Sequence, residues 1–213
     1  MFDEDNKANG VDIEKVFSSE EMLDVYDENL NIIGIKSRKD VHKYGLKHKV
    51  VQCYIVRKED MNKYVYFQQR SFKKSNYPGL YDIACAGHID SGEKTETSMV
   101  RELIEEVGIY VDENKLINCG IKFERKDHDD ILDDEICQLY VLEVFSDKFD
   151  CGDEVENMVK VSFEEYKKWV NHEIDELKAI CLDNNEIIKL NNFNICDHIR
   201  ENNNTLIKII ENI

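Results

Sequence analysis

The sequence predicts an α/β domain, with strands and helices alternating along the chain, and a helical extension at its C-terminal end. Short runs of β-branched and aromatic residues recur between polar turns, which is typical of strands. Residues 97–107 instead have apolar side chains at helical spacing and are followed by Gly108, a residue that commonly ends helices. No repeat or glycine-serine linker divides the 213 residues, so one domain with appendages is expected.

The first half of the chain predicts five strands and one short helix. Ser37, with Asp40 three residues later, is typical of a helix cap. The polar stretch between the third and fourth strands predicts a hairpin, and residues 71–79 predict a basic loop ending in Pro78-Gly79. The strands are expected at residues 22–26, 32–36, 49–56, 64–68 and 81–86.

The second half predicts two more strands and a mainly helical end. The strands are expected at residues 116–123 and 136–144, joined by a charged loop over 124–135. Ser162, with Glu165 three residues later, predicts a capped helix through Asn171. The last forty residues have apolar spacing that suits one or two helices, the final one near 203–213. The expected organisation is a flexible leader (1–19), the domain (20–175) and a helical extension packed on it (176–213).

The acidic composition restricts the kinds of partner. There are 45 acidic and 28 basic residues, a formal net charge of −17, which disfavours a nucleic-acid duplex. No apolar run is long enough to span a membrane, and the acidic N-terminus is unlike a signal peptide. Seven scattered cysteines without a CxxC pair fit a reduced, cytoplasmic setting. A homodimer stays open.

The segment expected to form the long helix is amphipathic in an unusual way. Val100, Leu103 and Val107 form an apolar stripe suited to packing on a sheet. At about 100° per residue, three glutamates lie on another part of the surface, within roughly 100° of one another. These are Glu102, Glu105 and Glu106.

Three carboxylates on one helix face repel one another unless a cation lies among them. Mg²⁺ prefers carboxylate oxygens, and bound Mg²⁺ neutralises phosphate charge and activates water. Arg101 can orient a neighbouring carboxylate through a charge-assisted hydrogen bond. For the three glutamates alone, an ordinary solvated acidic face is the favoured alternative.

The complete spacing shifts the interpretation toward metal binding. The pattern is G-x5-E-x7-R-E-U-x-E-E-x-G-U, where U is aliphatic, and every position is filled. The filling residues are Gly87, Glu93, Arg101, Glu102, Leu103, Glu105, Glu106, Gly108 and Ile109. This segment resembles the signature of the Nudix hydrolase family.

The resemblance implies the Nudix fold, a mixed β-sheet between helices, and hydrolysis of a small-molecule diphosphate with Mg²⁺ or Mn²⁺. It also implies that Glu102, Glu105 and Glu106 are the metal ligands. Glu93 and Arg101 are expected to order the loop and the helix around them.

A wider stretch, about residues 23–169, is similar to the branch of this family near isopentenyl-diphosphate isomerase. The matching pieces are His42-Lys-Tyr-Gly-Leu-Lys-His48, Gln69-Arg70-Ser71, Tyr77-Pro78-Gly79, Ala86-Gly87-His88 and Asp133-Asp134-Glu135. By position, this similarity implies a second metal site formed by His42, His48, His88, Asp133 and Glu135. Imidazole ligands favour Mn²⁺ or Zn²⁺ at such a site.

The same similarity implies that Arg70 and Lys74 bind the diphosphate, and Gly87 is a further candidate for substrate binding. Each residue also has a simpler interpretation. A lone histidine is usually an ordinary surface or core residue, and the basic residues can be a solvated loop.

The chain departs from the isomerases at their catalytic cysteine. The residue before Gly87 is Ala86, and Cys85 lies one position earlier. Neighbours in a strand point to opposite faces, so Cys85 is expected to be a small buried residue turned away from the pocket.

Hydrolysis is therefore the favoured activity. Isomerisation and a non-catalytic binding module are the alternatives. Asp133, Glu135 and Glu154 are candidates for a general base, and the group attached to the diphosphate stays open.

Overall fold

The computed structural model describes residues 20–128, 131–200 and 204–213, so the leader expected over 1–19 lies outside the described residues. The strands are β1 Met22–Tyr26, β2 Ile32–Ser37, β3 His48–Glu59, β4 Asn62–Arg70, β5 Tyr81–Ile83, β6 Cys85–His88, β7 Ile117–His128, β8 Ile131–Glu143, β9 Val155–Ser162, β10 Leu177–Cys181 and β11 Ile187–Leu190. The helices are α2 Arg38–Tyr44, α3 Thr95–Val107, α4 Phe163–Val170 and α5 Asn204–Asn212, with 3₁₀ turns η1 Glu113–Lys115 and η2 Asp197–Arg200.

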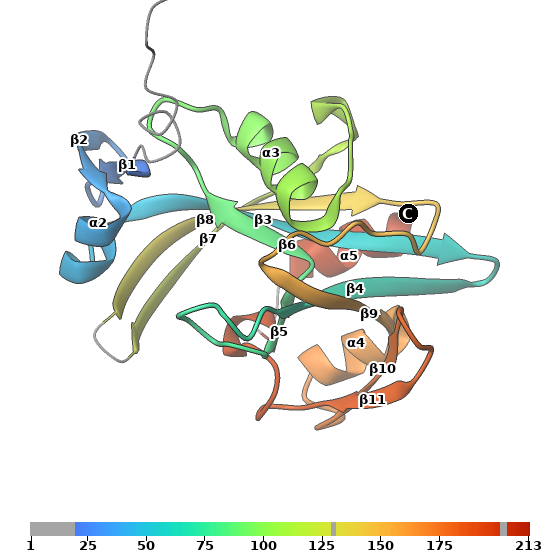
Figure 1. Cartoon of the computed structure of the whole chain (residues 1–213). Helices are drawn as coiled ribbons and strands as arrows, with labels where there is room; N and C mark the ends of the chain where they lie inside the picture. Colours follow the sequence, from blue (N-terminus) through green and yellow to red (C-terminus); the bar gives the residue numbers. More distant parts are fainter. Residues whose placement is uncertain (1–19, 129–130, 201–203) are drawn as a thin grey trace, which may run out of the picture.

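Strand β3 is the centre of one mixed sheet (Figure 1). The sheet runs in the order β11-β10-β9-β4-β3-β1-β2, with β5 on β4, β6 on β3, and the β7–β8 pair on β3. Strands β3 and β8 are parallel, whereas β3 pairs antiparallel with β1, β4 and β6. The predicted α/β class and the hairpin between β3 and β4 are therefore confirmed.

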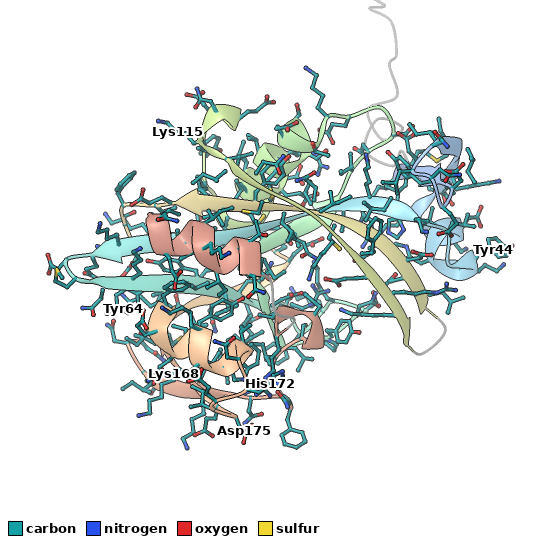
Figure 2. The ribbon with its side chains drawn as sticks, turned by 180° about the vertical axis from the view of Figure 1, so that it is seen from behind. Tyr44, Tyr64, Lys115, Lys168, His172 and Asp175 are labelled. Carbon is teal, nitrogen blue, oxygen red and sulfur yellow. The ribbon has the colours of Figure 1, made fainter. Side chains whose placement is uncertain are left out.

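Alternation along β3 explains why helices cover both faces of the sheet. Val50, Tyr54 and Val56 belong to the core that includes α4 and α5. Val51 and Ile55 belong to the core under α3. Figure 2, the view from behind, shows α5 lying across the strands on the face opposite α3. The expected sandwich of a mixed sheet between helices is confirmed.

Helix α3 lies as the spacing predicted, with one change in its buried stripe. Its buried apolar residues are Met99, Leu103 and Val107, while Val100 is only half-buried, so the prediction for Val100 was wrong. Met99, Leu103 and Val107 are four apart and lie above one another on the face toward β3 and β6. Gly108 ends the helix at φ +67°, a conformation that suits glycine.

Two expectations about strands and loops were wrong. Residues 81–86 form two strands rather than one: β5 pairs with β4 and β6 pairs with β3, so the chain changes neighbour at Ala84. The charged stretch 124–135 extends β7 and β8 on both sides of residues 129–130. In this register Arg125 lies opposite Asp134 and Lys126 opposite Asp133, while Glu124 lies opposite Glu135.

The end of the chain adds strands as well as a helix. Strands β10 and β11 extend the sheet beyond β9, and α5 is the terminal helix that the spacing predicted. Ser37 caps α2 by accepting a hydrogen bond from the Asp40 amide, as predicted. Ser162 precedes α4 but makes no side-chain cap bond, so that part of the prediction was wrong. None of the helices in the described ranges is long and apolar enough to span a bilayer.

Candidate active site

A deep pocket beside α3, called here the α3 pocket, brings together most of the residues singled out in the sequence. Within the described part of the chain, His48 and Glu93 lie outside its lining but contact residues that line it. The predicted residues that do line it are His42, Arg70, Lys74, Gly87, His88, Arg101, Glu102, Glu105, Glu106, Asp133, Glu135 and Glu154.

Arg101 holds the glutamate cluster in place. One of its terminal nitrogens donates to Glu102 at 2.7 Å and to Glu105 at 3.3 Å. The other donates to Glu93 at 3.2 Å and to the His88 carbonyl oxygen at 3.0 Å. The guanidinium therefore joins α3 to strand β6 and to the loop before the helix, as the spacing suggested.

Glu102 lies directly against the backbone of Gly87. A Cβ atom added at Gly87 would lie 2.1 Å from the carboxyl carbon of Glu102. Only glycine leaves room for the carboxylate there. Burial raises the pKa of Glu102 to about 8, against the opposing effect of Arg101. A divalent cation would offset this cost of burying the charge.

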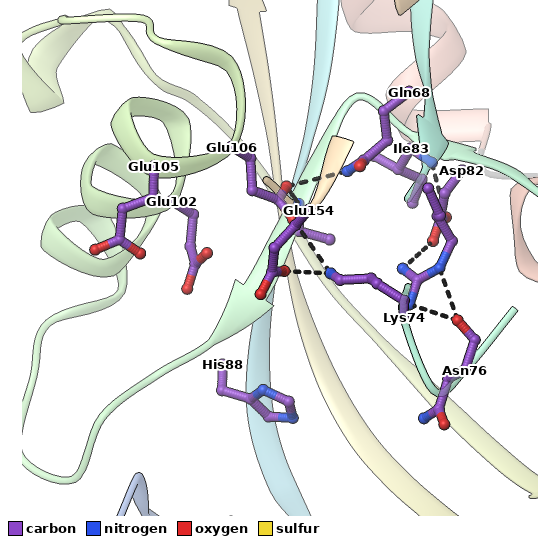
Figure 3. A network of polar contacts seen from close by, with 12 residues as sticks. Gln68, Lys74, Asn76, Asp82, Ile83, His88, Glu102, Glu105, Glu106 and Glu154 are labelled. Carbon is purple, nitrogen blue, oxygen red and sulfur yellow. Dashed lines mark hydrogen bonds and ion pairs between the residues drawn. The ribbon is translucent and has the colours of Figure 1, made fainter. Parts of the chain in front are cut away.

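Glu106 is the most buried of the three glutamates, and its side chain points across the pocket (Figure 3). One of its oxygens accepts from the Gln68 amide at 3.0 Å and from the Ala86 backbone N–H at 3.1 Å. The other lies 3.8 Å from the Lys74 ammonium. Burial raises the pKa of Glu106, and the Lys74 charge opposes that shift.

Glu105 differs from the other two because its side chain is 59% exposed. Figure 3 shows Glu105 beside Glu102 on α3, with the buried Glu106 turned away from both toward Gln68 and Lys74. The three carboxylates therefore differ in solvent exposure, from the buried and hydrogen-bonded Glu106 to Glu105, which faces water. Such a set offers several oxygen ligands at the wall of one pocket.

The basic residues expected to bind a diphosphate occupy the wall opposite α3. Lys74 reaches Glu106 and also pairs with Glu154. Arg70 donates to Asp82 at 3.0 Å and to the Asn76 carbonyl oxygen through two nitrogens. Arg70 thus anchors the 71–79 loop at the pocket wall.

Three histidines from distant segments converge at one end of the α3 pocket. His42 comes from α2, His48 from the start of β3 and His88 from the end of β6. One ring nitrogen of each lies within 4.8 Å of the others. The Nε2 atoms of His42 and His88 are 3.3 Å apart.

The Nδ1 contacts decide which ring nitrogens are available to a metal. His42 and His48 each place Nδ1 against a backbone carbonyl oxygen, at 2.7 and 2.9 Å, so each Nδ1 must donate. His88 places Nδ1 3.2 Å from the Glu21 carboxylate. Burial of Glu21 raises the pKa of its carboxyl group. The hydrogen bond from His88 opposes this effect and, together with Arg38, lowers that pKa to about 2. Neutral rings with Nδ1 protonated carry a lone pair on Nε2.

These lone pairs point toward one another and toward an acid. His48 Nε2 is buried and has no hydrogen-bond partner among the described residues. His42 Nε2 lies 3.3 Å from Asp133 Oδ1, an atom that also lacks a hydrogen bond there. Burial lowers the pKa of His48 to about 3 and also lowers that of His88. Ring nitrogens that converge in this way fit a transition-metal ion, and the Nδ1 contacts orient the rings.

Strand β8 supplies the acids near this cluster. Glu135 lies opposite His48 in the parallel pair of β3 and β8. Asp133 lies two residues earlier, so both acids point to the same face, as expected for an extended segment. Burial, followed by the charge of Asp133, raises the pKa of Glu135 to about 8.

A polar network that the sequence analysis missed closes the far wall. His198 Nε2 donates to Asp82 at 2.7 Å, and Lys126 donates to His198 Nδ1 at 2.8 Å. Lys126 also lies 3.2 Å from Glu124. Burial opposes ionisation of Glu124, but His198, Lys122 and Lys126 together lower its pKa to about 2. No spacing in the sequence connects these residues, since His198 is 116 positions from Asp82.

Cys85 has the position that strand alternation predicted. It is fully buried in the core under α3. Among the described residues that line the α3 pocket are Ala86 and Gly87, but not Cys85. Burial and the nearby Glu106 carboxylate raise the pKa of the Cys85 thiol well above its usual value.

A mixed sheet between helices, with this glutamate helix packed against β6, defines a Nudix hydrolase. The family model described as NUDIX domain matches residues 46–183, and the chain belongs to the Nudix family. A crystal structure of a Deinococcus radiodurans protein shares the fold, with a TM-score of 0.54 and 18% identity over 68% of this chain and 85% of that one.

Relatives in sequence include hydrolases and isomerases. An uncharacterized Nudix hydrolase of Clostridium acetobutylicum is 38% identical over 166 residues, covering 75% of this chain and 79% of that protein. An isopentenyl-diphosphate Delta-isomerase of Serratia proteamaculans is 30% identical over 122 residues, covering 57% of this chain and 65% of that protein. The similarity to the isomerase branch is therefore confirmed.

Proposed function

We propose that the protein hydrolyses a diphosphate linked to another group, such as a nucleoside diphosphate derivative, by attack of water at phosphorus. Glu102, Glu105 and Glu106 would hold Mg²⁺ or Mn²⁺. The observation that carries this proposal is their shared position on the wall of one pocket, with Arg101 bonded to two of them. When bound, the metal supplies positive charge that neutralises phosphate oxygens and activates water.

The protein's own side chains organise the rest of the reaction. Arg101 fixes Glu102, and Gln68 fixes Glu106, so two ligands are preorganised before substrate arrives. Lys74 reaches from the opposite wall to within 3.8 Å of Glu106 and can balance the charge of a phosphate bound beside this pair.

Of the three candidates for a general base, Glu154 suits the role best. It is 61% exposed and lies beside Lys74 in the pocket wall (Figure 3). Glu135 holds its proton near neutral pH because burial raises its pKa to about 8. Asp133 faces the histidine cluster through its contact with His42.

The test is a substrate panel with Mg²⁺ or Mn²⁺, in which the released phosphorus species are identified by ³¹P NMR. The panel contains nucleoside diphosphate derivatives, deoxynucleoside triphosphates, dinucleotide cofactors and isoprenoid diphosphates. Metal-dependent cleavage of a diphosphate bond is expected, and Glu105→Gln should reduce its rate by about 100-fold or more. If no member of the panel is cleaved with either metal, the proposal is contradicted.

We also infer a second metal site formed by His42, His48 and His88, with Asp133 and Glu135 beside them. The convergence of one ring nitrogen from each histidine supports it, and Mn²⁺ or Zn²⁺ fits imidazole ligands better than Mg²⁺. Crystals soaked in MnCl₂ should give anomalous density between the rings. Calorimetry should show that His42→Gln loses one class of Mn²⁺ sites while His172→Gln keeps it. The absence of anomalous density between the three rings at saturating Mn²⁺ would refute the site.

Isomerisation of isopentenyl diphosphate is the second candidate activity, because the histidine cluster matches that branch of the family. The position of the isomerase cysteine is occupied by Ala86, and the Cys85 thiol is buried. Incubation with isopentenyl diphosphate should therefore yield no dimethylallyl diphosphate by mass spectrometry. Efficient isomerisation that is lost in Cys85→Ala would overturn the preference for hydrolysis.

A further inference from the structure

A second groove adjoins the α3 pocket, between α2 and the 71–79 loop, and is called here the basic groove. It shares Arg38, His42, Arg70, Lys74, Asn76 and Glu154 with the α3 pocket. The remaining lining residues are Lys39, Lys43, Ser71, Lys73, Ser75 and Asp153. The two depressions are therefore continuous, and a molecule bound in one can extend into the other.

The charge of the basic groove is opposite to that of the whole protein. The chain has 45 acidic and 28 basic residues. The groove lining has two carboxylates, Asp153 and Glu154, against six cations. These cations are Arg38, Lys39, Lys43, Arg70, Lys73 and Lys74. A concentration of positive charge on so acidic a protein attracts an anion locally, where the rest of the surface repels it.

Half of these cations already have partners within the protein. Arg38 pairs with Glu21, Arg70 pairs with Asp82, and Lys74 pairs with Glu154.

The other three face the groove without such partners. Lys39, Lys43 and Lys73 are exposed, and in the described ranges none of them forms an ion pair. Lys43 lies 5.0 Å from the ring centre of Tyr44, and its charge is not neutralised there. Three uncompensated ammonium groups around one depression repel each other, and an anion between them would relieve that repulsion.

We propose that the basic groove binds an anionic group of the substrate other than the diphosphate that is cleaved, through Lys39, Lys43 and Lys73. This rests on the proposed hydrolysis, which places the diphosphate beside the α3 glutamates and Lys74. A substrate held there projects its attached group toward α2 and the 71–79 loop, since the two depressions are joined. The preferred substrates therefore carry at least one further phosphate. Exposed ammonium groups attract it mainly by long-range charge, so its contribution falls with added salt.

The first test measures binding without catalysis. The probe is inorganic tripolyphosphate, titrated into the whole protein in low salt without added metal, by calorimetry. The groove variant is Lys39→Glu combined with Lys73→Glu. The control variant is Lys168→Glu combined with Lys178→Glu, which gives the same net charge. Both control lysines are exposed, and Figure 2 shows Lys168 far from Tyr44 at the end of α2.

The groove variant should lose affinity for tripolyphosphate by about tenfold relative to the control variant, because two attractive charges become repulsive. Equal affinities for the two variants would overturn the proposal. The measurement needs no turnover, so it does not depend on whether the proposed hydrolysis is correct.

The second test compares substrates that differ by one phosphate. NADPH has one phosphate more than NADH, and coenzyme A has one more than dephospho-coenzyme A. The wild type and the control variant should prefer the more phosphorylated member by about tenfold in kcat/KM, mainly through KM, at low salt. The groove variant should lose this preference while kcat stays the same. A preference that survives in the groove variant would overturn the proposal. If no member of the whole substrate panel is cleaved while the groove variant still loses affinity for tripolyphosphate, the proposed hydrolysis fails and the anion site stands.

Discussion

The contact between Gly87 and Glu102 gives a sharp test of the glutamate site. In Gly87→Ala, the new Cβ would lie 2.1 Å from the carboxyl carbon of Glu102, and 2.2 and 2.5 Å from its two oxygens. Ordinary van der Waals contact begins at 3.4 Å. The carboxylate must therefore move by more than about 1 Å, away from β6 and out of its bond with Arg101.

The effect on activity should greatly exceed the effect on stability. The clashing atoms are the end of a flexible side chain, so the backbone need not move. A misplacement of about 1 Å in a catalytic group can cost about 100-fold in rate. We expect Gly87→Ala to reduce kcat by about that factor. The stability should change by less than about 1 kcal/mol, since alanine is tolerated at least as well as glycine in a strand.

The assay is the initial rate of phosphate-bond cleavage on the best substrate of the panel, over a range of Mg²⁺ concentrations. Thermal unfolding of each variant is followed in parallel. Gly34→Ala is the matched control, because no described heavy atom outside its own chain neighbours lies within 4 Å of its added Cβ. A folded Gly87→Ala protein with wild-type kcat would refute the idea that Glu102 must occupy this position.

Three further predictions concern single residues. Glu105→Gln should lower kcat by about 100-fold or more without changing the melting temperature, because an amide is a poor Mg²⁺ ligand and the side chain is largely exposed; a normal rate would remove Glu105 from the site. The pKa of His48 is about 3 in the folded protein, below its usual value, so the unfolded state takes up the proton first as the pH falls. In EDTA, the wild type should therefore lose about 2 kcal/mol more stability than His48→Gln between pH 7.5 and pH 5, measured by urea unfolding, and parallel curves would contradict this. His198→Leu should cost about 2–3 kcal/mol because the buried Asp82 loses a hydrogen bond, and adding Asp82→Asn should recover part of that loss.

The sequence by itself determined the features that depend on local spacing. The arrangement of Glu102, Glu105 and Glu106 on α3 follows from helix geometry, and Gly108 ends that helix as predicted. Alternation along β6 placed Cys85 in the core and Ala86 in the pocket wall. Each of these predictions involves residues a few positions apart, whose relative directions are set by one backbone conformation.

The tertiary structure decided everything that joins distant segments. His42, His48 and His88 converge because α2, β3 and β6 meet, and Glu135 faces His48 because β3 and β8 pair in a particular parallel register.

Local composition was also misleading where pairing outweighed it. The charged stretch over 124–135 favours a loop in isolation, yet the pairing of β7 with β8 continues through it. Whether two side chains meet depends on strand register and core packing, which involve the whole chain. That is the physical reason why the glutamate helix could be predicted from the sequence while the contact between His198 and Asp82 could not.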